Sequence, residues 1–354
     1  MEKLYRIEKD FLGEKRIELN KYYGIQTLRA KENFNITKTD ISLFPNFIKS
    51  LAKVKKACAL TNFELGDLTD IQKDAIVQAC NEIIDGKFHD QFIVDPIQGG
   101  AGTSTNMNAN EVIANRALEI LGHPKSSYNI IHPNNHINMS QSTNDVYPTA
   151  IKLTLHELIY KLKDALRFLR DCFEEKAIEF KDVLKMGRTQ LQDAVPMTLG
   201  QEFKTFAVMI DDDIYRLRNV QALLKEINLG ATAIGTGINT KASYQRKVIS
   251  NLREVTGVDY VSAGDLIEAT QDTGSFVHIS GMLKSVAIKI SKICNDLRLL
   301  SSGPRAGFNE INLPPLQPGS SIMPGKVNPV MPEVVNQVAF EVIGDRKSTR
   351  LNSS

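Results

Sequence analysis

The chain has 354 residues, of which 42% are hydrophobic and 24% are charged, proportions that are ordinary for a globular protein with one or more cores. Its 43 basic and 41 acidic residues are well mixed and give a net charge of +2, which argues against a nucleic-acid-binding protein. No apolar run is long enough to cross a bilayer, so a membrane protein is not expected.

The cysteines, histidines and glycines predict neither a cofactor nor a metal. Four cysteines stand apart, with no C-x-x-C pair (Cys58, Cys80, Cys172 and Cys294); this is typical of reduced packing residues in a cytoplasmic protein. The six histidines lack a convincing ligand spacing. The glycine-rich segment 230–237 matches neither the dinucleotide-binding nor the phosphate-binding pattern. The charged N-terminal residues 1–16 lack the apolar segment of a signal peptide, so a cytoplasmic location is expected.

The first clear helices lie in the N-terminal third. Thr69 and Gln72 form a capping-box pattern, and Gly86 is a stop signal, so a helix is expected between them. A second helix is expected over residues 109–121, closed by Gly122.

Much longer helices follow. Apolar residues recur at three- and four-residue steps over 148–180 and 275–300, and less regularly over 197–227, which predicts long helices. Helices of this length need partners to cover their apolar stripes. The sequence therefore predicts an all-α fold, with a small N-terminal helical domain over 1–141 and a long-helix bundle over 142–344.

Residues 319–329, GSSIMPGKVNP, are the most informative segment. Glycine allows unusual backbone angles, and proline interrupts regular structure, so a loop is expected. Such a loop can aim backbone N–H groups at an anion, with Lys326 adding a positive charge. A serine among these donors could ionise and act as a base. An ordinary surface loop is the alternative.

Four further polar segments carry candidate side chains. Residues 102–111 and 141–145 place small hydroxyl residues before a helix, where N–H groups and the positive helix end can bind a carboxylate. Residues 186–196 and 302–314 are polar and contain glycine and proline. Each of these segments alone would be an ordinary helix cap or loop.

Together these segments and the 319–329 loop resemble the signature regions of the fumarase/aspartase superfamily, over roughly residues 5 to 344. Ser142-Thr143-Asn144 resembles the aspartase members, since fumarases usually carry Ser-Ser-Asn, and Gln190 stands where fumarases have histidine. The resemblance implies a cofactor-free lyase that converts L-aspartate reversibly to fumarate and ammonia. It also implies that a base removes the Cβ proton to give an aci-carboxylate intermediate.

The resemblance assigns a role to each candidate residue. Ser320 is expected to be the catalytic base. The side chains expected to hold the β-carboxylate are Thr103, Ser142, Thr143 and Ser321. Those expected to hold the α-carboxylate are Thr189, Lys326 and Asn328. Asn144 and Gln190 are expected to contact the amino group.

The resemblance further implies a homotetramer whose active sites are shared between subunits. Members of the superfamily extend further at the C-terminus, so the chain is expected to be truncated, with the C-terminal domain absent. Residues 345–354, DRKSTRLNSS, break the helical pattern of 332–344 and are expected to be a non-native tail. A chain of this kind is expected to assemble poorly and to show little activity.

Two alternatives stay open at this point. Fumarate hydratase is the nearest, and Ser142-Thr143 together with Gln190 counts against it. The other is a non-catalytic structural or binding protein on the same scaffold, against which the retention of Ser320 and Lys326 counts.

Overall fold

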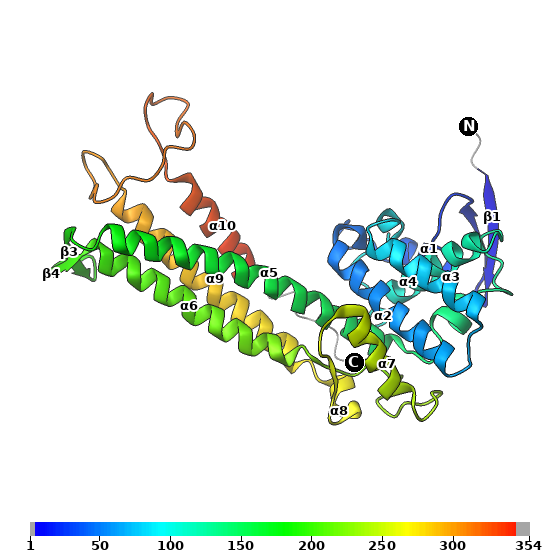
Figure 1. Cartoon of the computed structure of the whole chain (residues 1–354). Coiled ribbons are helices and arrows are strands. Elements are labelled where there is room, and N and C mark those ends of the chain that lie inside the picture. Colours follow the sequence, from blue (N-terminus) through cyan, green and yellow to red (C-terminus); the bar gives the residue numbers. More distant parts are fainter. Residues whose placement is uncertain (1–3, 345–354) are drawn as a thin grey trace. The chain divides into compact units, whose positions relative to one another are not determined.

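The computed structural model describes residues 4–344, and these form two compact units. Unit 1 comprises residues 4–157 and 224–272, and unit 2 comprises residues 158–223 and 273–344. Helices dominate both units (Figure 1), and the strands are short pairs, so the expected all-α fold is confirmed. The expected tail, 345–354, lies outside the described residues.

Unit 1 consists of helices around one core, with short strands at its margins. Its helices are α1 (Ile25–Asn33), α2 (Pro45–Glu64), α3 (Asp70–Ile84), α4 (Thr103–Ile120), the first part of α5 (Thr143–Glu179), α7 (Tyr244–Thr256) and α8 (Leu266–Gln271). Its shorter elements are η1 (Ile41–Leu43), η2 (His89–Gln91), the π-helical turn η3 (Pro133–Ile137), the antiparallel pair β1 (Tyr5–Asp10) and β2 (Gly13–Glu18), and the parallel pair β5 (Glu226–Ile227) and β6 (Val261–Ser262).

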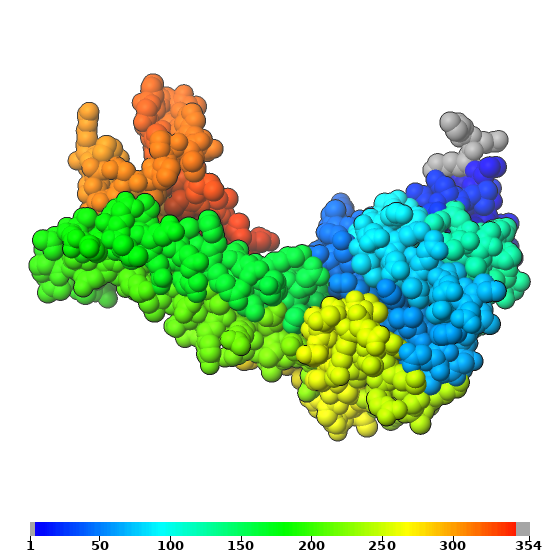
Figure 2. Space-filling model, in the orientation of Figure 1, coloured from blue at the N-terminus to red at the C-terminus, as the bar shows by residue number. Residues whose placement is uncertain are grey.

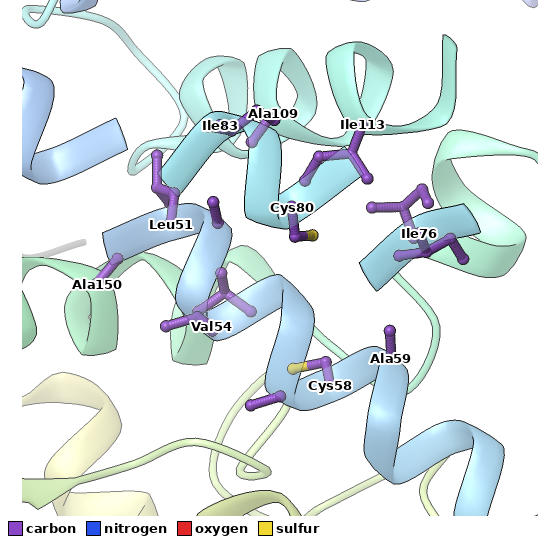
Figure 3. Close-up of a cluster of buried hydrophobic side chains, with 14 of the residues drawn as sticks. Leu51, Val54, Cys58, Ala59, Ile76, Cys80, Ile83, Ala109, Ile113 and Ala150 are labelled. Atoms are coloured by element: carbon purple, nitrogen blue, oxygen red, sulfur yellow. The ribbon is translucent and has the colours of Figure 1, made fainter. Parts of the chain in front are cut away.

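The core of unit 1 lies where α2, α3, α4 and the start of α5 meet. Figure 3 shows Leu51 of α2, Ile83 of α3 and Ile113 of α4 among the side chains of this cluster. Burying each such aliphatic side chain contributes about 1.5–3 kcal/mol. Cys58 and Cys80 lie inside this core, where burial raises the pKa of both thiols to about 12. They are the packing residues that the sequence predicted.

The helix boundaries follow local signals closely where those signals are strong. Thr69 caps α3 and shares a reciprocal capping box with Gln72, as predicted. Helix α4 begins at Thr103, earlier than the predicted residue 109. Helix α5 begins at Thr143 and runs through Pro148.

Unit 2 is a bundle of long helices. It contains the rest of α5, α6 (Leu199–Leu223), α9 (Gly274–Leu300), α10 (Val330–Gly344), and the antiparallel hairpin of β3 (Leu184–Thr189) and β4 (Gln192–Thr198). Phe173 of α5 packs edge-on against Phe203 and Phe206 of α6. Lys289 of α9 pairs with the buried Asp213 of α6 at 2.6 Å, and α10 packs along α9. No helix among residues 4–344 is long and apolar enough to span a membrane.

The two units differ from the domain boundary expected at residue 141. The start of α5 and residues 224–272 belong to unit 1. A hydrogen-bonded link explains this, because Asp145 of α5 accepts bonds from the backbone N–H groups of Gly230 and Thr232. A long-range contact of this kind leaves no trace in hydrophobic periodicity.

Candidate active site

An open cavity of about 620 Å³ lies in unit 1, where the N-terminal ends of α4 and α5 come together. Residues of η3 and of the glycine-rich segment complete its wall. Its lining includes Thr103, Asn106, Asn138, Gln141, Ser142, Thr143, Thr232 and Asn239. Because the N-terminal end of a helix carries partial positive charge and unpaired N–H groups, the cavity favours an anion.

Close packing fixes the start of α4. Gly102 adopts φ +89°, and a Cβ on it would lie 2.6 Å from the ring of Tyr147, so only glycine fits there. The next residue, Thr103, lines the cavity and is exposed. Its hydroxyl donates to the carbonyl oxygen of Gly100 at 2.7 Å. In this structure the hydrogen of Thr103 Oγ1 is therefore already engaged.

The predicted Ser142 lies directly before the start of α5. Its hydroxyl oxygen accepts a bond from the N–H of Asn144 at 3.2 Å, and its backbone N–H donates to Asp145 at 3.0 Å. Asp145 is fully buried. Burial raises the pKa of Asp145 to about 6, against the opposing effect of the N–H groups of Thr232, Ser142 and Gly230.

Thr143 and Asn144 follow in the first turn of α5. Thr143 is only 8% exposed, and its Oγ1 accepts a bond from Asn106 Nδ2 at 3.1 Å. The amide nitrogen of Asn144 donates to the carbonyl oxygen of Ala233 at 2.8 Å. Because the nitrogen of the Asn144 amide makes this bond, its oxygen remains available as an acceptor.

A buried lysine lies beneath the cavity. Lys55 of α2 is 1% exposed, and its ammonium donates to Asn138 Oδ1 at 3.0 Å and to Gln141 Oε1 at 2.8 Å. Burial lowers the pKa of Lys55 to about 8, so the ammonium form dominates at neutral pH. Lys55 is not among the residues predicted from the sequence. The available signal was a lysine inside the buried stripe of α2.

The glycine-rich segment also belongs to this site, although it matched no known pattern. It contributes Thr232 and Ala233 to the cavity wall, and Ile238 and Asn239 follow directly after it. A Cβ on Gly235 would lie 2.4 Å from the Cα of Ile267. Gly235 therefore allows a close approach to the start of α8 that a larger residue would prevent.

Unit 2 carries the other predicted residues in two places. The first is the turn of the β3–β4 hairpin, where Thr189 ends β3 and Gln190 begins the turn. Gln190 and Leu191 have φ of 55° and 62°, a left-handed conformation that is unusual outside glycine, asparagine and aspartate. Both predicted side chains, Thr189 and Gln190, are exposed.

The second place is the 319–329 loop between α9 and α10, which stands out from the bundle surface (Figure 2). It closes on itself through a bond from Gly319 N–H to the Lys326 carbonyl at 2.8 Å and one from Asn328 Nδ2 to the Gly319 carbonyl at 2.9 Å. A Cβ on Gly319 would lie 2.6 Å from Asn328 N. Ser321 and Lys326 point from this loop into solvent.

Ser320 occupies a distinctive position in this loop. Its hydroxyl oxygen accepts bonds from the N–H groups of Ile322 at 3.2 Å and Met323 at 3.0 Å. Backbone donors of this kind favour the ionised form of the oxygen that they face.

The predicted residues are thus divided between the units. Unit 1 brings Thr103, Ser142 and Thr143 together at the cavity, followed in α5 by Asn144. Unit 2 holds Thr189, Gln190, Ser320, Ser321, Lys326 and Asn328. Within unit 2, Glu310 ties the α9–α10 connection to the hairpin through Arg188 and through Lys185, at 3.1 Å from the latter. Among residues 4–344, no three His, Cys, Asp or Glu side chains gather as a metal site.

Residues 13–344 match the family model described as lyase. The chain belongs to this lyase family. The lyase is 61% identical over 346 residues to the aspartate ammonia-lyase of Helicobacter pylori, covering 98% of this chain and 74% of that protein. The predicted resemblance to the fumarase/aspartase superfamily is therefore confirmed.

Solved structures show the same fold. A fumarate lyase:delta crystallin from Brucella melitensis superposes on the lyase with a TM-score of 0.94 at 56% identity, covering 96% of this chain and 74% of that one. The class II fumarase from Schistosoma mansoni gives a TM-score of 0.92 at 36% identity, covering 96% and 74% respectively.

Proposed function

We propose that this lyase converts L-aspartate reversibly to fumarate and ammonia, by cleavage of a carbon–nitrogen bond. The observation that carries the proposal is the 61% identity to the Helicobacter pylori aspartate ammonia-lyase over 98% of this chain. The chemistry of the cavity supports it, as does the donor-rich loop around Ser320.

The unit 1 cavity suits the β-carboxylate of the substrate. Ser142 and Thr143 each use the hydroxyl oxygen as an acceptor toward a neighbouring N–H, which keeps the hydroxyl hydrogen available for a carboxylate. The positive ends of α4 and α5 and the ammonium of Lys55 favour negative charge there. Thr103 would join them after its hydroxyl leaves the Gly100 carbonyl, and Ser321 is the fourth member of this proposed group.

The amino group of aspartate is positively charged and needs acceptors. The Asn144 amide directs its nitrogen at the Ala233 carbonyl, so its oxygen can accept a bond from the substrate ammonium. Gln190 is the second proposed contact, presented by the exposed turn of the hairpin.

Ser320 is the proposed base. Its alkoxide would take the Cβ proton of aspartate, and the electron pair would move into the β-carboxylate to give an aci-carboxylate dianion. As that pair returns to form the Cα–Cβ double bond, the Cα–N bond breaks and ammonia leaves, with fumarate as the other product. Preorganised donors around the β-carboxylate lower the barrier because they stabilise the charge that develops there.

Thr189, Lys326 and Asn328 are the proposed contacts of the α-carboxylate. In the part of the chain that the structure describes, the Lys326 ammonium forms no ion pair and is exposed, so it is available to a substrate carboxylate. A charged hydrogen bond of this kind is stronger than a neutral one. None of the proposed steps requires a metal or a cofactor, and we propose a cytoplasmic enzyme that uses neither.

We further propose a homotetramer whose subunits share active sites. Two features support this: the site residues lie on both units, and the bundle helices expose large apolar side chains. On α10 these include Met331, Val338 and Phe340, exposed by 55%, 60% and 64%. Apolar surface of this kind usually marks an interface.

The test is to incubate purified protein separately with L-aspartate and L-malate and to follow fumarate by its absorbance. Fumarate from aspartate and not from malate is the expected result. Faster formation from malate would favour fumarate hydratase, the alternative that the similarity to the Schistosoma mansoni fumarase keeps open. No turnover of either by the folded tetramer would leave the non-catalytic alternative.

A further inference from the structure

The orientation of the side chains beneath the cavity can be deduced from a single group, the ammonium of Lys55. An ammonium can only donate hydrogen bonds. The atom of Asn138 that faces it at 3.0 Å must therefore be the amide oxygen. Gln141, whose Oε1 faces the same ammonium at 2.8 Å, is oriented in the same way.

This assignment fixes the next amide. Asn138 Oδ1 also faces Asn106 at 3.0 Å and Asn110 at 3.2 Å. Because an acceptor oxygen needs donors, both of these asparagines must present their NH₂ groups to it. Asn106 is 1% exposed, so water does not compete for these bonds.

The same NH₂ group of Asn106 lies 3.1 Å from Thr143 Oγ1. Since an amide nitrogen only donates, Thr143 must accept, and its hydroxyl hydrogen cannot point at Asn106. No residue in the described part of the chain accepts a hydrogen bond from this hydroxyl. Thr143 lines the cavity, so the cavity is the direction left to its hydrogen.

We propose that Asn106 is a positioning residue, which turns the hydroxyl hydrogen of Thr143 into the cavity and so presents it to the substrate carboxylate. Only the identity of that carboxylate rests on the proposed function. Thr103 shows the contrast, because its hydroxyl has no such partner and donates to the Gly100 carbonyl instead. Thr143 is thus the pre-oriented donor of the two.

The orientation of the Asn106 amide leaves one of its atoms unpaired, as does that of Asn110. Asn106 Oδ1 is buried and has no hydrogen-bond partner, which typically costs about 1–3 kcal/mol. Turning the amide over would let its oxygen accept from the Thr143 hydroxyl, but that oxygen would then also face the amide oxygen of Asn138, which would lose a donor. The orientation that serves Thr143 is therefore kept at a cost in stability.

Asn106→Asp is the informative substitution, since it keeps the size of the side chain and replaces the donor with an acceptor. The hydroxyl hydrogen of Thr143 should then turn to the new carboxylate and away from the cavity. We expect kcat/KM for L-aspartate to fall about 10- to 100-fold, the equivalent of one hydrogen bond to a charged group. The fall should be larger in kcat than in 1/KM, because this bond strengthens as charge develops on the β-carboxylate.

The kinetic control is a double-mutant cycle with Thr143→Val. If Asn106 acts through the Thr143 hydroxyl, adding Asn106→Asp to Thr143→Val should change kcat/KM by less than about threefold. Repulsion between the new carboxylate and the substrate would instead persist in the double variant. Asn110→Leu is the matched control, since Asn110 donates to the same Asn138 oxygen and does not reach Thr143. It should leave kcat/KM within about threefold of wild type while lowering the melting temperature.

A second measurement does not depend on turnover. Neutron diffraction from crystals exchanged into D₂O locates the deuterium on Thr143 Oγ1. Deuterium directed into the cavity supports the proposal, and deuterium directed at Asn106 overturns it. If the effects of Asn106→Asp and Thr143→Val on kcat/KM of an active enzyme were additive, the proposal would be overturned as well. Wild-type protein that shows the expected deuterium position without turning over aspartate would instead contradict the proposed function alone.

Discussion

At the scale of single residues, the hydroxyl of Ser320 can act as a base only if its alkoxide is stabilised. Two backbone N–H groups face its oxygen, and they provide part of that stabilisation. We expect Ser320→Ala to lower kcat by about 10²–10⁴-fold, with an unchanged helical circular dichroism spectrum. Ser321→Ala, one residue away, should mainly raise KM, since it is a proposed carboxylate contact. A well-folded Ser320→Ala protein with near-wild-type turnover would exclude the serine as the base.

Lys55 gives a pH-dependence with a defined sign. Burial lowers the pKa of Lys55 from 10.5 to about 8, so between these values the folded protein has lost a proton that the unfolded chain still holds. The unfolded state then binds more protons, and the free energy of unfolding rises with pH. The difference between the two pKa values corresponds to about 3 kcal/mol at most.

We therefore expect wild-type protein to gain stability relative to Lys55→Met as the pH rises from 7.5 to 10, by urea denaturation. Comparison with the variant removes the contributions of other titrating groups, which both proteins share. Lys56→Met, at a neighbouring position that is only half-buried, serves as the control and should not change this slope. Parallel stability curves for wild type and Lys55→Met would contradict the assigned direction.

Only some of the residues around the cavity could be predicted from the sequence. The hydroxyls at positions 142 and 143 were predicted because their motif precedes a helix and resembles known ones. Lys55, Asn106 and Asn138 were not, because their importance comes from bonds across about 30 to 80 residues of chain. Isolated amide residues and one lysine on an apolar helix face form no sequence motif that would predict a binding site.

At the scale of elements, α5 contains a proline, and a side chain from outside the helix replaces the hydrogen-bond donor that the proline lacks. Pro148 has no N–H, so the carbonyl of Asn144 lacks its usual helical donor. Asn228, from outside the helix, donates to this carbonyl at 3.0 Å and also to Thr270 at 3.1 Å. This contact explains why α5 can begin at Thr143, five residues before Pro148.

The contact predicts the effect of two substitutions. Asn228→Leu should lower the free energy of unfolding by about 0.5–1.5 kcal/mol, because the part-buried carbonyl of Asn144 loses its hydrogen-bond donor. Pro148→Ala restores a backbone N–H, so the loss caused by Asn228→Leu should be smaller in that background. Chemical denaturation of the four proteins measures both effects. If Asn228→Leu lowered the free energy of unfolding equally in the wild-type and the Pro148→Ala backgrounds, the lost bond to the Asn144 carbonyl would not explain the effect.

The elements that were predicted correctly are those whose signals are local. Capping residues and apolar stripes located α3, α6 and α9, since each depends on residues within a few turns. The β3–β4 hairpin was not foreseen, because β4 is exposed on both faces along most of its length and therefore shows no alternation. Its turn uses Gln190 and Leu191 in left-handed conformations, which no turn preference of these residue types would indicate.

At the scale of the whole molecule, the proposed homotetramer can be tested on α10. This helix exposes Val338 and Phe340 by 60% and 64%, next to a loop that carries the proposed base. A charge at either position would lose its hydration in an apolar interface, so Val338→Asp with Phe340→Asp should prevent assembly. Because the proposed site residues lie on both units, activity should fall together with the tetramer.

Light scattering and an aspartate assay on the same sample decide between the outcomes. We expect the double variant to be smaller than wild type and inactive, while Gln337→Asp, the same charge at an exposed polar position of α10, keeps both properties. An active monomer would contradict shared sites, and a tetramer of the double variant would place the interface elsewhere.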